Sequence, residues 1–273
     1  MADTTFDGIS NFRDVGATIN TLSHAPLLQE KTLYRSGRLD DASIADRARL
    51  VDEYGLATVV DLRTKSEHIK QKQTQRPPRL DVWKTVQIYF VSRRFEMYML
   101  GQLAWWQIVQ FLFLMLVRFR LAAIRILGQN VLGPRGLVGL SKDSLRFCQP
   151  EICAALDVLV LPQYSAPVLV HCTQGKDRSG LVVMLALFAV GIPLELVRAE
   201  YELSDAGLAP VRASMIKEVE EIGMDEAYTR APPEVVEAVW NCLEEEYGGV
   251  EAYLDLIGFT QDKRRTLKKI LLV

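Results

Sequence analysis

The pattern at 167–187 constrains the fold of this chain more than any other stretch. Its first part, 167–170, is apolar and has the length of a buried strand, and 181–187 is apolar enough for a buried helix. The decapeptide between them reads His171-Cys172-Thr173-Gln174-Gly175-Lys176-Asp177-Arg178-Ser179-Gly180. A strand, a tight loop and a helix in this order point backbone N–H groups and a helix N-terminus at one place, which attracts anions and phosphate above all. The sequence therefore predicts an anion-binding loop here.

Four side chains of this loop are candidate catalytic residues. The setting favours the thiolate form of Cys172, which could attack phosphorus and form a phosphocysteine intermediate. Arg178, six residues later, offers two donors to phosphate oxygens. Asp177 could donate a proton to the leaving oxygen or orient Arg178, and Ser179 could assist expulsion of the thiolate when water attacks. The alternative is a buried cysteine that happens to precede a helix, and the surrounding strand, glycine turn and helix argue against it.

The other loop residues are candidate substrate-binding residues. The backbone amides from Thr173 to Arg178, which include that of Gln174, would hold the equatorial phosphate oxygens. Gly175 permits the tight turn and a close backbone approach. Lys176 adds a second positive charge, unless it is a solvated lysine at the start of a helix. His171 would order the loop.

The loop resembles that of the cysteine-dependent protein tyrosine phosphatase superfamily, and more narrowly its atypical bacterial and fungal branch with Gly-Lys-Asp-Arg in the loop. Other stretches typical of that branch are 11–15, 33–37, 59–63, 201–204 and 247–249 with 253–254. The similarity covers nearly the whole chain, except about 64–140. It implies an α/β fold with a central, mostly parallel sheet flanked by helices. In the resembling lipid phosphatases, a lysine at the position of Lys176 helps to bind multiply phosphorylated headgroups.

The general acid is the least defined part of the predicted site. Most of the superfamily carries an aspartate in a Trp-Pro-Asp tripeptide, which this chain lacks. The branch often has an aspartate after the strand that follows Asp-Leu-Arg, but 87–94 contains no carboxylate. Asp177 is therefore the first candidate. Asp61 is a distant second, because with Arg63 at the end of a strand it favours a structural ion pair, and Asp143 has little weight.

The chain is expected to form one domain over 1–273. Its 273 residues, 49% of them hydrophobic, can bury one large core or two small ones, and no linker, repeat or low-complexity run divides them. Strand patterns occur at 57–62, 82–90 and 167–171. Helical patterns occur at about 40–54, 103–127, 144–160, 180–190, 194–203, 210–223, 233–247 and 260–272.

Charge, cysteine and histidine content bear on the expected ligands and location of the protein. A net charge of −2 argues against a general nucleic-acid binder. The start of the chain has no apolar core for a signal peptide. The four cysteines show neither disulfide nor zinc spacing, and the three histidines are widely separated, so we expect no metal and no cofactor. Because a catalytic thiolate needs a reducing compartment, a cytoplasmic location is expected.

The stretch 97–117 has no charged residue over 21 positions. It is long enough to span a bilayer, but a span here would separate the 11–15 and 59–63 stretches from Cys172, and the fold needs them together. In the resembling branch this region forms apolar helices over the active site, so we expect 93–140 to be a helical lid. The same segment could also make a peripheral membrane contact.

Three functions remain open at this stage. The first is a phosphatase acting on phosphotyrosine or phosphoserine proteins or on phosphoinositides. The second has the same catalysis but an apolar small substrate, such as a lipid or prenyl phosphate or diphosphate. The third is a catalytically silent phosphate-binding scaffold, which is disfavoured because Cys172 and Arg178 are both present.

Overall fold

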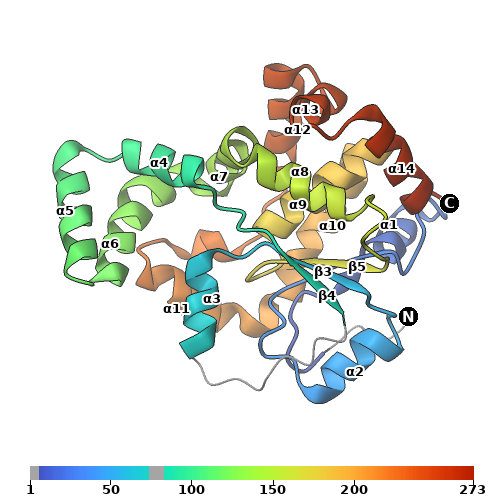
Figure 1. Cartoon of the computed structure of the whole chain (residues 1–273), viewed down its shortest axis with the longest axis horizontal. Coiled ribbons are helices and arrows are strands. Elements are labelled where there is room, and N and C mark those ends of the chain that lie inside the picture. Colours follow the sequence, from blue (N-terminus) through green and yellow to red (C-terminus); the bar gives the residue numbers. More distant parts are fainter. Residues whose placement is uncertain (1–5, 74–82) are drawn as a thin grey trace.

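A computed structural model describes residues 6–73 and 83–273. A five-stranded sheet with the order β1-β2-β5-β3-β4 runs through its body (Figure 1). The strands are β1 (Arg13–Asp14), β2 (Leu33–Ser36), β3 (Thr58–Asp61), β4 (Lys84–Gln87) and β5 (Val168–His171). Only β1 is antiparallel to its neighbour, so the sheet is mostly parallel. The expected α/β class is confirmed.

Helices account for most of the rest of the described chain. They are α1 (Val15–Ser23), α2 (Ile44–Asp52), α3 (Lys65–Gln73), α4 (Arg93–Gly101), α5 (Trp105–Leu116), α6 (Arg120–Leu127), α7 (Gly133–Phe147), α8 (Gln149–Val158), α9 (Asp177–Val190), α10 (Leu194–Gly207), α11 (Arg212–Glu221), α12 (Glu234–Tyr247), α13 (Val250–Leu256) and α14 (Gln261–Leu271). In Figure 1, α2 lies below the sheet, and α8, α9 and α10 lie above it. The parallel sheet is thus covered on both faces.

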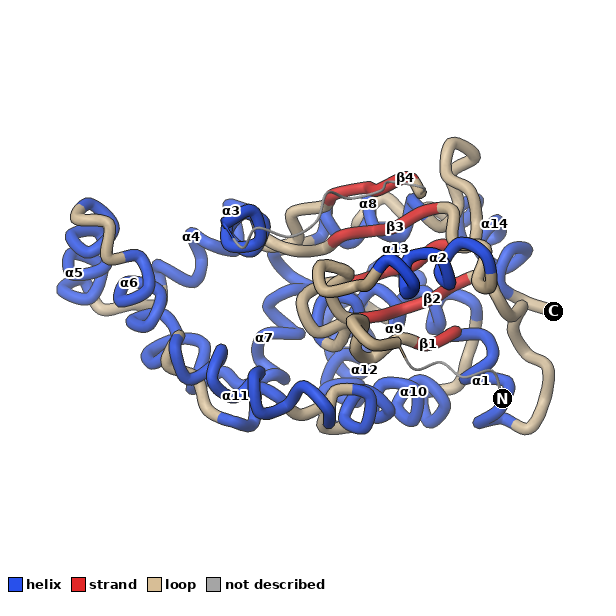
Figure 2. Tube along the Cα trace, turned by 90° about the horizontal axis from the view of Figure 1, so that it is seen from below, coloured by secondary structure: helices blue, strands red, loops and turns tan. Residues whose placement is uncertain are grey.

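The strand sequences explain this layered arrangement. Successive side chains of a strand point to opposite faces, so a strand buried on both faces needs consecutive apolar residues. Val60 and Val170 point into the large core that surrounds α9. Their neighbours Val59 and Leu169 point into a smaller core beside α2. β5 is the central strand, between β2 and β3, and the loop that follows it therefore leaves from the middle of the sheet (Figure 2).

The predicted elements agree with the structure where the apolar pattern is strong. Strands at 57–62 and 167–171 are confirmed, and the strand predicted at 82–90 is shorter, at 84–87, with residue 82 outside the described part. The single helix predicted at 103–127 is wrong, because Arg118 takes a positive φ of 64° and separates α5 from α6. The helix predicted at 144–160 is likewise divided between α7 and α8.

The region 93–140 is helical, as expected, and contains α4, α5, α6 and the start of α7. Helices α5 and α6 pack on each other as a hairpin, and in both views α5 is the helix farthest from the sheet (Figures 1 and 2). In this arrangement α5 stands away from the loop after β5, so its action as a lid stays a prediction. No helix in the described part of the chain combines the length and apolarity needed to cross a membrane.

Candidate active site

The loop at 172–176 joins the end of β5 to the start of α9. Its first residue, Cys172, is only 2% exposed. Gly175 adopts a φ of +66°, and a Cβ atom there would lie 2.0 Å from the backbone oxygen of Ser36. Any other residue would be strained in backbone conformation and would collide with β2. The predicted need for glycine at this turn is confirmed.

The backbone carbonyls of 173–176 all accept hydrogen bonds from the surrounding scaffold. The backbone N–H of Arg38 donates to the first at 3.0 Å, and the side-chain amide of Asn11 donates to the second at 3.1 Å. The Arg35 guanidinium donates to the third at 2.7 Å and to the fourth at 3.1 Å. Because the N–H of a trans peptide lies opposite its C=O, carbonyls turned toward the scaffold leave the amides facing the inside of the loop. This orientation suits an anion site.

Glu200 holds the two arginines of this scaffold in place. Its carboxylate accepts from Arg13 and from Arg35, each at 2.7 Å, and both oxygens are buried. Arg13 also donates to the side-chain oxygen of Asn11, so Arg13, Arg35 and Glu200, here called the Glu200 cluster, also hold the asparagine that contacts the loop. Burial disfavours the charged form of Glu200, but the two arginines outweigh burial and keep the pKa of this carboxyl below its ordinary value.

Glu67, near the start of α3, holds the side chain of Arg178. Nη1 and Nη2 of Arg178 donate to the two carboxylate oxygens at 2.7 and 2.8 Å, and Nη1 also donates to the Leu62 carbonyl at 3.2 Å. The Thr173 hydroxyl donates to the same carboxylate. Burial alone would raise the pKa of Glu67, but the charge and hydrogen bonds of Arg178 hold it well below its usual range. The guanidinium therefore has a fixed orientation beside Cys172.

Lys176 and Asp177 bind each other at the N-terminus of α9. Nζ of Lys176 donates to the Asp177 carboxylate at 2.8 Å and to the Tyr228 carbonyl at 3.3 Å. Lys176 is completely buried, so the reading as a solvated lysine is wrong. The Asp177 side chain is 42% exposed. The Asp177 carboxylate is bonded to Lys176 and not to Arg178. This contact argues against a role in orienting Arg178 and favours Asp177 as the proton donor.

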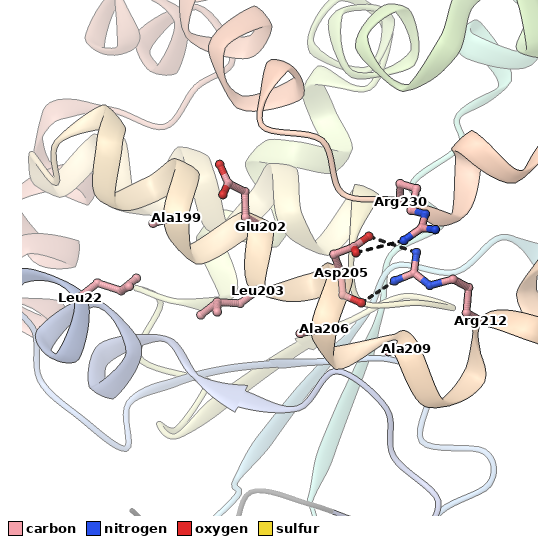
Figure 3. A pocket seen from close by; sticks show the side chains of 9 residues that line it. All are labelled: Leu22, Ala199, Glu202, Leu203, Asp205, Ala206, Ala209, Arg212 and Arg230. Atoms are coloured by element: carbon pink, nitrogen blue, oxygen red, sulfur yellow. Dashed lines mark hydrogen bonds and ion pairs between the residues drawn. The ribbon is translucent and has the colours of Figure 1, made fainter.

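A shallow cavity of about 600 Å³ lies along α10 (Figure 3). In its wall, Asp205 accepts from Arg212 at 3.1 Å and from Arg230 at 3.4 Å. Arg212 also donates to the Thr229 carbonyl, beside the residue whose carbonyl binds the lysine. None of the predicted site residues lines this cavity.

The other predicted acids are committed to structural partners. Asp61 accepts from Nε and Nη2 of Arg63 at 2.9 and 2.7 Å, so the ion pair expected for it is present. Asp143 is buried, 2.7 Å from Arg135, and accepts from the Tyr98 hydroxyl at 3.3 Å. Neither side chain is available to donate a proton at the loop.

His171 and Ser179 lie on either side of the loop and are both buried. Nδ1 of His171 is 3.2 Å from the Cys172 carbonyl oxygen, and its Nε2 is 3.6 Å from Asp61. Burial lowers the pKa of His171, which suits the structural role expected for it. The Ser179 hydroxyl has no hydrogen-bond partner among residues 6–73 and 83–273. Across the same ranges, no group of three His, Cys, Asp or Glu side chains is arranged to hold a metal ion.

Sequence reasoning missed both glutamates of the site. Glu67 lies in the poorly matched stretch, although Thr64-x-x-Glu67 has the pattern of a helix capping box, and the structure contains both of its hydrogen bonds. That pattern gives the start of α3 but not the contact with Arg178. Glu200 directly precedes the 201–204 stretch, yet nothing in its neighbours indicates two arginines far earlier in the chain.

Comparison with known proteins agrees with this geometry. The profile of the tyrosine phosphatase family matches residues 4–273. The triple specificity protein phosphatase PtpB of Mycobacterium tuberculosis is 27% identical, and the alignment covers the whole of both chains. A tyrosine-protein phosphatase of Nostoc commune is 29% identical over 40% of this chain and 40% of its own.

Proposed function

The chain belongs to the tyrosine phosphatase family, and we propose that it hydrolyses phosphate monoesters through a phosphocysteine intermediate on Cys172. The observation that carries this proposal is the position of the nucleophile. Cys172 lies at the end of the central strand, in a loop whose carbonyls are all bonded outward and whose amides face inward. Preorganised amides of this kind stabilise charge that develops in the transition state.

In the first step, the Cys172 thiolate attacks phosphorus as the bond from phosphorus to the ester oxygen breaks. Arg178 binds two equatorial oxygens through the edge that includes Nε, because Glu67 takes the edge formed by Nη1 and Nη2. The leaving oxygen takes the proton of the Asp177 carboxyl group and departs as an alcohol. Of Asp61, Asp143, Glu67 and Asp177, only Asp177 has a substantially exposed side chain and no bond to an arginine in the described part of the chain.

In the second step, water attacks the phosphocysteine and the bond from phosphorus to sulfur breaks. The Asp177 carboxylate takes a proton from that water, and the products are inorganic phosphate and the Cys172 thiolate. The buried Ser179 hydroxyl has no other partner in the described structure and donates to the departing sulfur. Asp177 is thereby returned to its protonated form for the next turnover.

The Asp177→Asn variant is expected to lower kcat about 100-fold for an alkyl phosphate, because the leaving oxygen then departs without a proton. The loss is expected to be smaller for a nitrophenyl phosphate, whose leaving group needs little protonation. Inhibition by inorganic phosphate should be nearly unchanged. Asp262→Asn, an exposed aspartate on α14, is the matched control. If Asp177→Asn had the same kcat as wild type at every pH, the general acid would be a residue other than Asp177.

The Glu67→Gln variant is expected to lower kcat/KM about 10- to 100-fold, because both charged bonds that fix the orientation of Arg178 go to this carboxylate, and a neutral amide can keep only one of them, without its charge. The inhibition constant of inorganic phosphate reports whether Arg178 is still correctly oriented, and the melting temperature reports whether the fold has been destabilised. Measuring both separates the two effects. Glu53→Gln, which removes an exposed i,i+4 partner of Arg49, is the control. Unchanged kcat/KM in Glu67→Gln would show that Arg178 holds its position without this contact.

We propose phosphoproteins and phosphoinositides as the substrates. Support comes from PtpB, described as a triple specificity protein phosphatase and alignable over its whole length. Lys176 adds a second positive charge beside the loop, which also favours an anionic headgroup. A lipid or prenyl phosphate is the second candidate, favoured by the apolar surface of α5, where Trp105 is 78% exposed and Leu116 is 80% exposed.

The test measures phosphate release without added metal from a phosphotyrosine peptide, a phosphoserine peptide, mono- and polyphosphoinositides, and a prenyl phosphate. Acid quenching during turnover, followed by mass spectrometry, should place a phosphoryl group on the peptide that contains Cys172. The substrate with the highest kcat/KM decides between the two substrate classes. Absence of release from every substrate would support the silent scaffold instead.

A further inference from the structure

One face of α5 is apolar and uncovered. Its members follow the spacing i, i+4, i+7, i+8 and i+11, which places them on one side of a helix. They are Trp105, Val109, Leu112, Phe113 and Leu116, each at least 57% exposed. The other side of α5 is already packed, because Ile108, Phe111 and Leu114 contact the large core. The exposed face, here called the α5 face, is therefore surplus to what folding of the hairpin requires.

The apolar surface continues into the turn after α5. Phe119 is 65% exposed and Leu121 is 53% exposed. Arg118 and Arg125 are exposed and form no ion pair with any residue that the structure describes. Arg120 is also exposed and donates to the Ser66 hydroxyl at 2.5 Å. Cations thus lie at one border of the apolar surface.

The charge of the whole segment has one sign. The hairpin of α5 and α6, residues 105–127, contains no aspartate or glutamate and carries three positive charges, Arg118, Arg120 and Arg125. Since the whole chain has a net charge of −2, the remainder carries −5 against +3 for this hairpin. The hairpin is thus a cationic, apolar projection from an acidic body, at one end of the molecule (Figure 1).

We propose that the α5 face docks on the surface of an anionic lipid bilayer. Apolar side chains would enter the boundary between headgroups and acyl chains, where tryptophan is favoured, and the arginines would reach lipid phosphates. A second copy of the chain is a poorer partner, because it would bring another three positive charges against these three. The proposal concerns binding alone and does not depend on the reaction proposed for Cys172.

The experiment is sedimentation of the full chain with vesicles of phosphatidylcholine, with and without phosphatidylserine. Wild type should sediment with the mixed vesicles and much less with phosphatidylcholine alone. The double variant Leu112→Gln/Leu116→Gln should lower the partition constant at least about 10-fold, because two large apolar side chains no longer enter the boundary. Arg118→Gln should lower it about five-fold on mixed vesicles only, which corresponds to about 1 kcal/mol for a cation near such a surface.

Matched controls lie on the C-terminal helices, where Leu256 is 62% exposed and Arg265 has a side chain 64% exposed. Leu256→Gln and Arg265→Gln should bind vesicles as wild type does. All variants should hydrolyse a soluble aryl phosphate at the wild-type rate, which keeps a failure of docking distinct from a failure of catalysis. Brominated lipids should quench the fluorescence of Trp105 and Trp106 in the wild type.

Three results would overturn the proposal. The first is equal sedimentation of wild type and the double variant. The second is a wild-type dimer that dissociates in the double variant and does not bind vesicles, since a second copy would then cover the α5 face. The third is absence of vesicle binding together with a changed KM for soluble apolar phosphates, since the hairpin would then close over the chain's own active site.

Discussion

The Cys172→Ser variant is expected to lose phosphate release by about four orders of magnitude or more on every substrate. A serine hydroxyl is not ionised at neutral pH and is a poor nucleophile without an adjacent base, and Asp177 carries its own proton during this first step. The substitution barely changes side-chain volume at a site only 2% exposed, so the fold should persist. Initial rates of phosphate release, at protein concentrations high enough to detect residual turnover, provide the measurement.

A second buried cysteine provides the matched control. Cys242 lies in α12, is 1% exposed, and takes no part in the proposed reaction. Cys242→Ser should therefore keep kcat within about two-fold, even if burial of a hydroxyl lowers the free energy of unfolding by about 1–3 kcal/mol. Cys172→Ser should still bind inorganic phosphate, because the loop amides and Arg178 remain. Residual release within about 10-fold of wild type by Cys172→Ser would reject the cysteine mechanism.

The Glu200→Gln variant is expected to lose about 3–5 kcal/mol of unfolding free energy, the cost of removing one partner of a buried charge cluster. The substitution keeps the shape of the side chain but leaves Arg13 and Arg35 buried without their shared counter-charge. Since Arg35 also bonds the carbonyls of Gly175 and Lys176, the loop should lose its inward-facing amides. Urea denaturation followed by circular dichroism measures the first effect, and affinity for inorganic phosphate measures the second.

Glu202 on the same helix is the control for Glu200. It is exposed and pairs with Arg198 at 3.6 Å, so Glu202→Gln should change stability by less than about 1 kcal/mol. Similar losses in the two variants would contradict the role given to the Glu200 cluster. In that case, a general effect of lowering negative charge on α10 would explain both losses.

The pKa of Glu200 also predicts how stability depends on pH. Its folded-state pKa lies below its unfolded value, which is near 4.3 for a free glutamate, so the unfolded chain binds the proton more readily. The stabilisation is complete above that value and is lost as the pH falls through the folded-state pKa. In Glu200→Gln, the decline of unfolding free energy below about pH 4 should therefore be shallower than in wild type.

The loop was predictable because its determinants are local. A strand, a turn that needs glycine and a buried helix are encoded within 167–187. Residues 172–178 could therefore be identified as an anion-binding loop without knowing which distant residues contact them. Burial of Lys176 was not predictable in the same way, since it depends on the carbonyl of Tyr228. The turn at Arg118 was also missed, because the apolar pattern continues on both sides of it.

The residues that hold the loop could not be found from local pattern. Arg35 and Glu200 are 165 positions apart, and Glu67 and Arg178 are 111 apart. A lone charged residue in an apolar or mixed stretch is usually a solvated side chain. Only the parallel pairing of β2 and β3 with β5 brings these side chains to one end of the sheet. The contacts between residues distant in sequence therefore depend on the order of the strands in the sheet, which a local sequence pattern does not give.

The Glu200 cluster has a consequence for synthesis of the chain. Cys172 is translated before Glu200, whereas Asn11 and Arg35 are translated long before either. A growing chain that has just exposed the loop has two N-terminal arginines but not the carboxylate that unites them, and it cannot yet fix the loop carbonyls. Phosphate binding is therefore expected to begin only after α10 has left the ribosome, when Glu200 can join the two arginines.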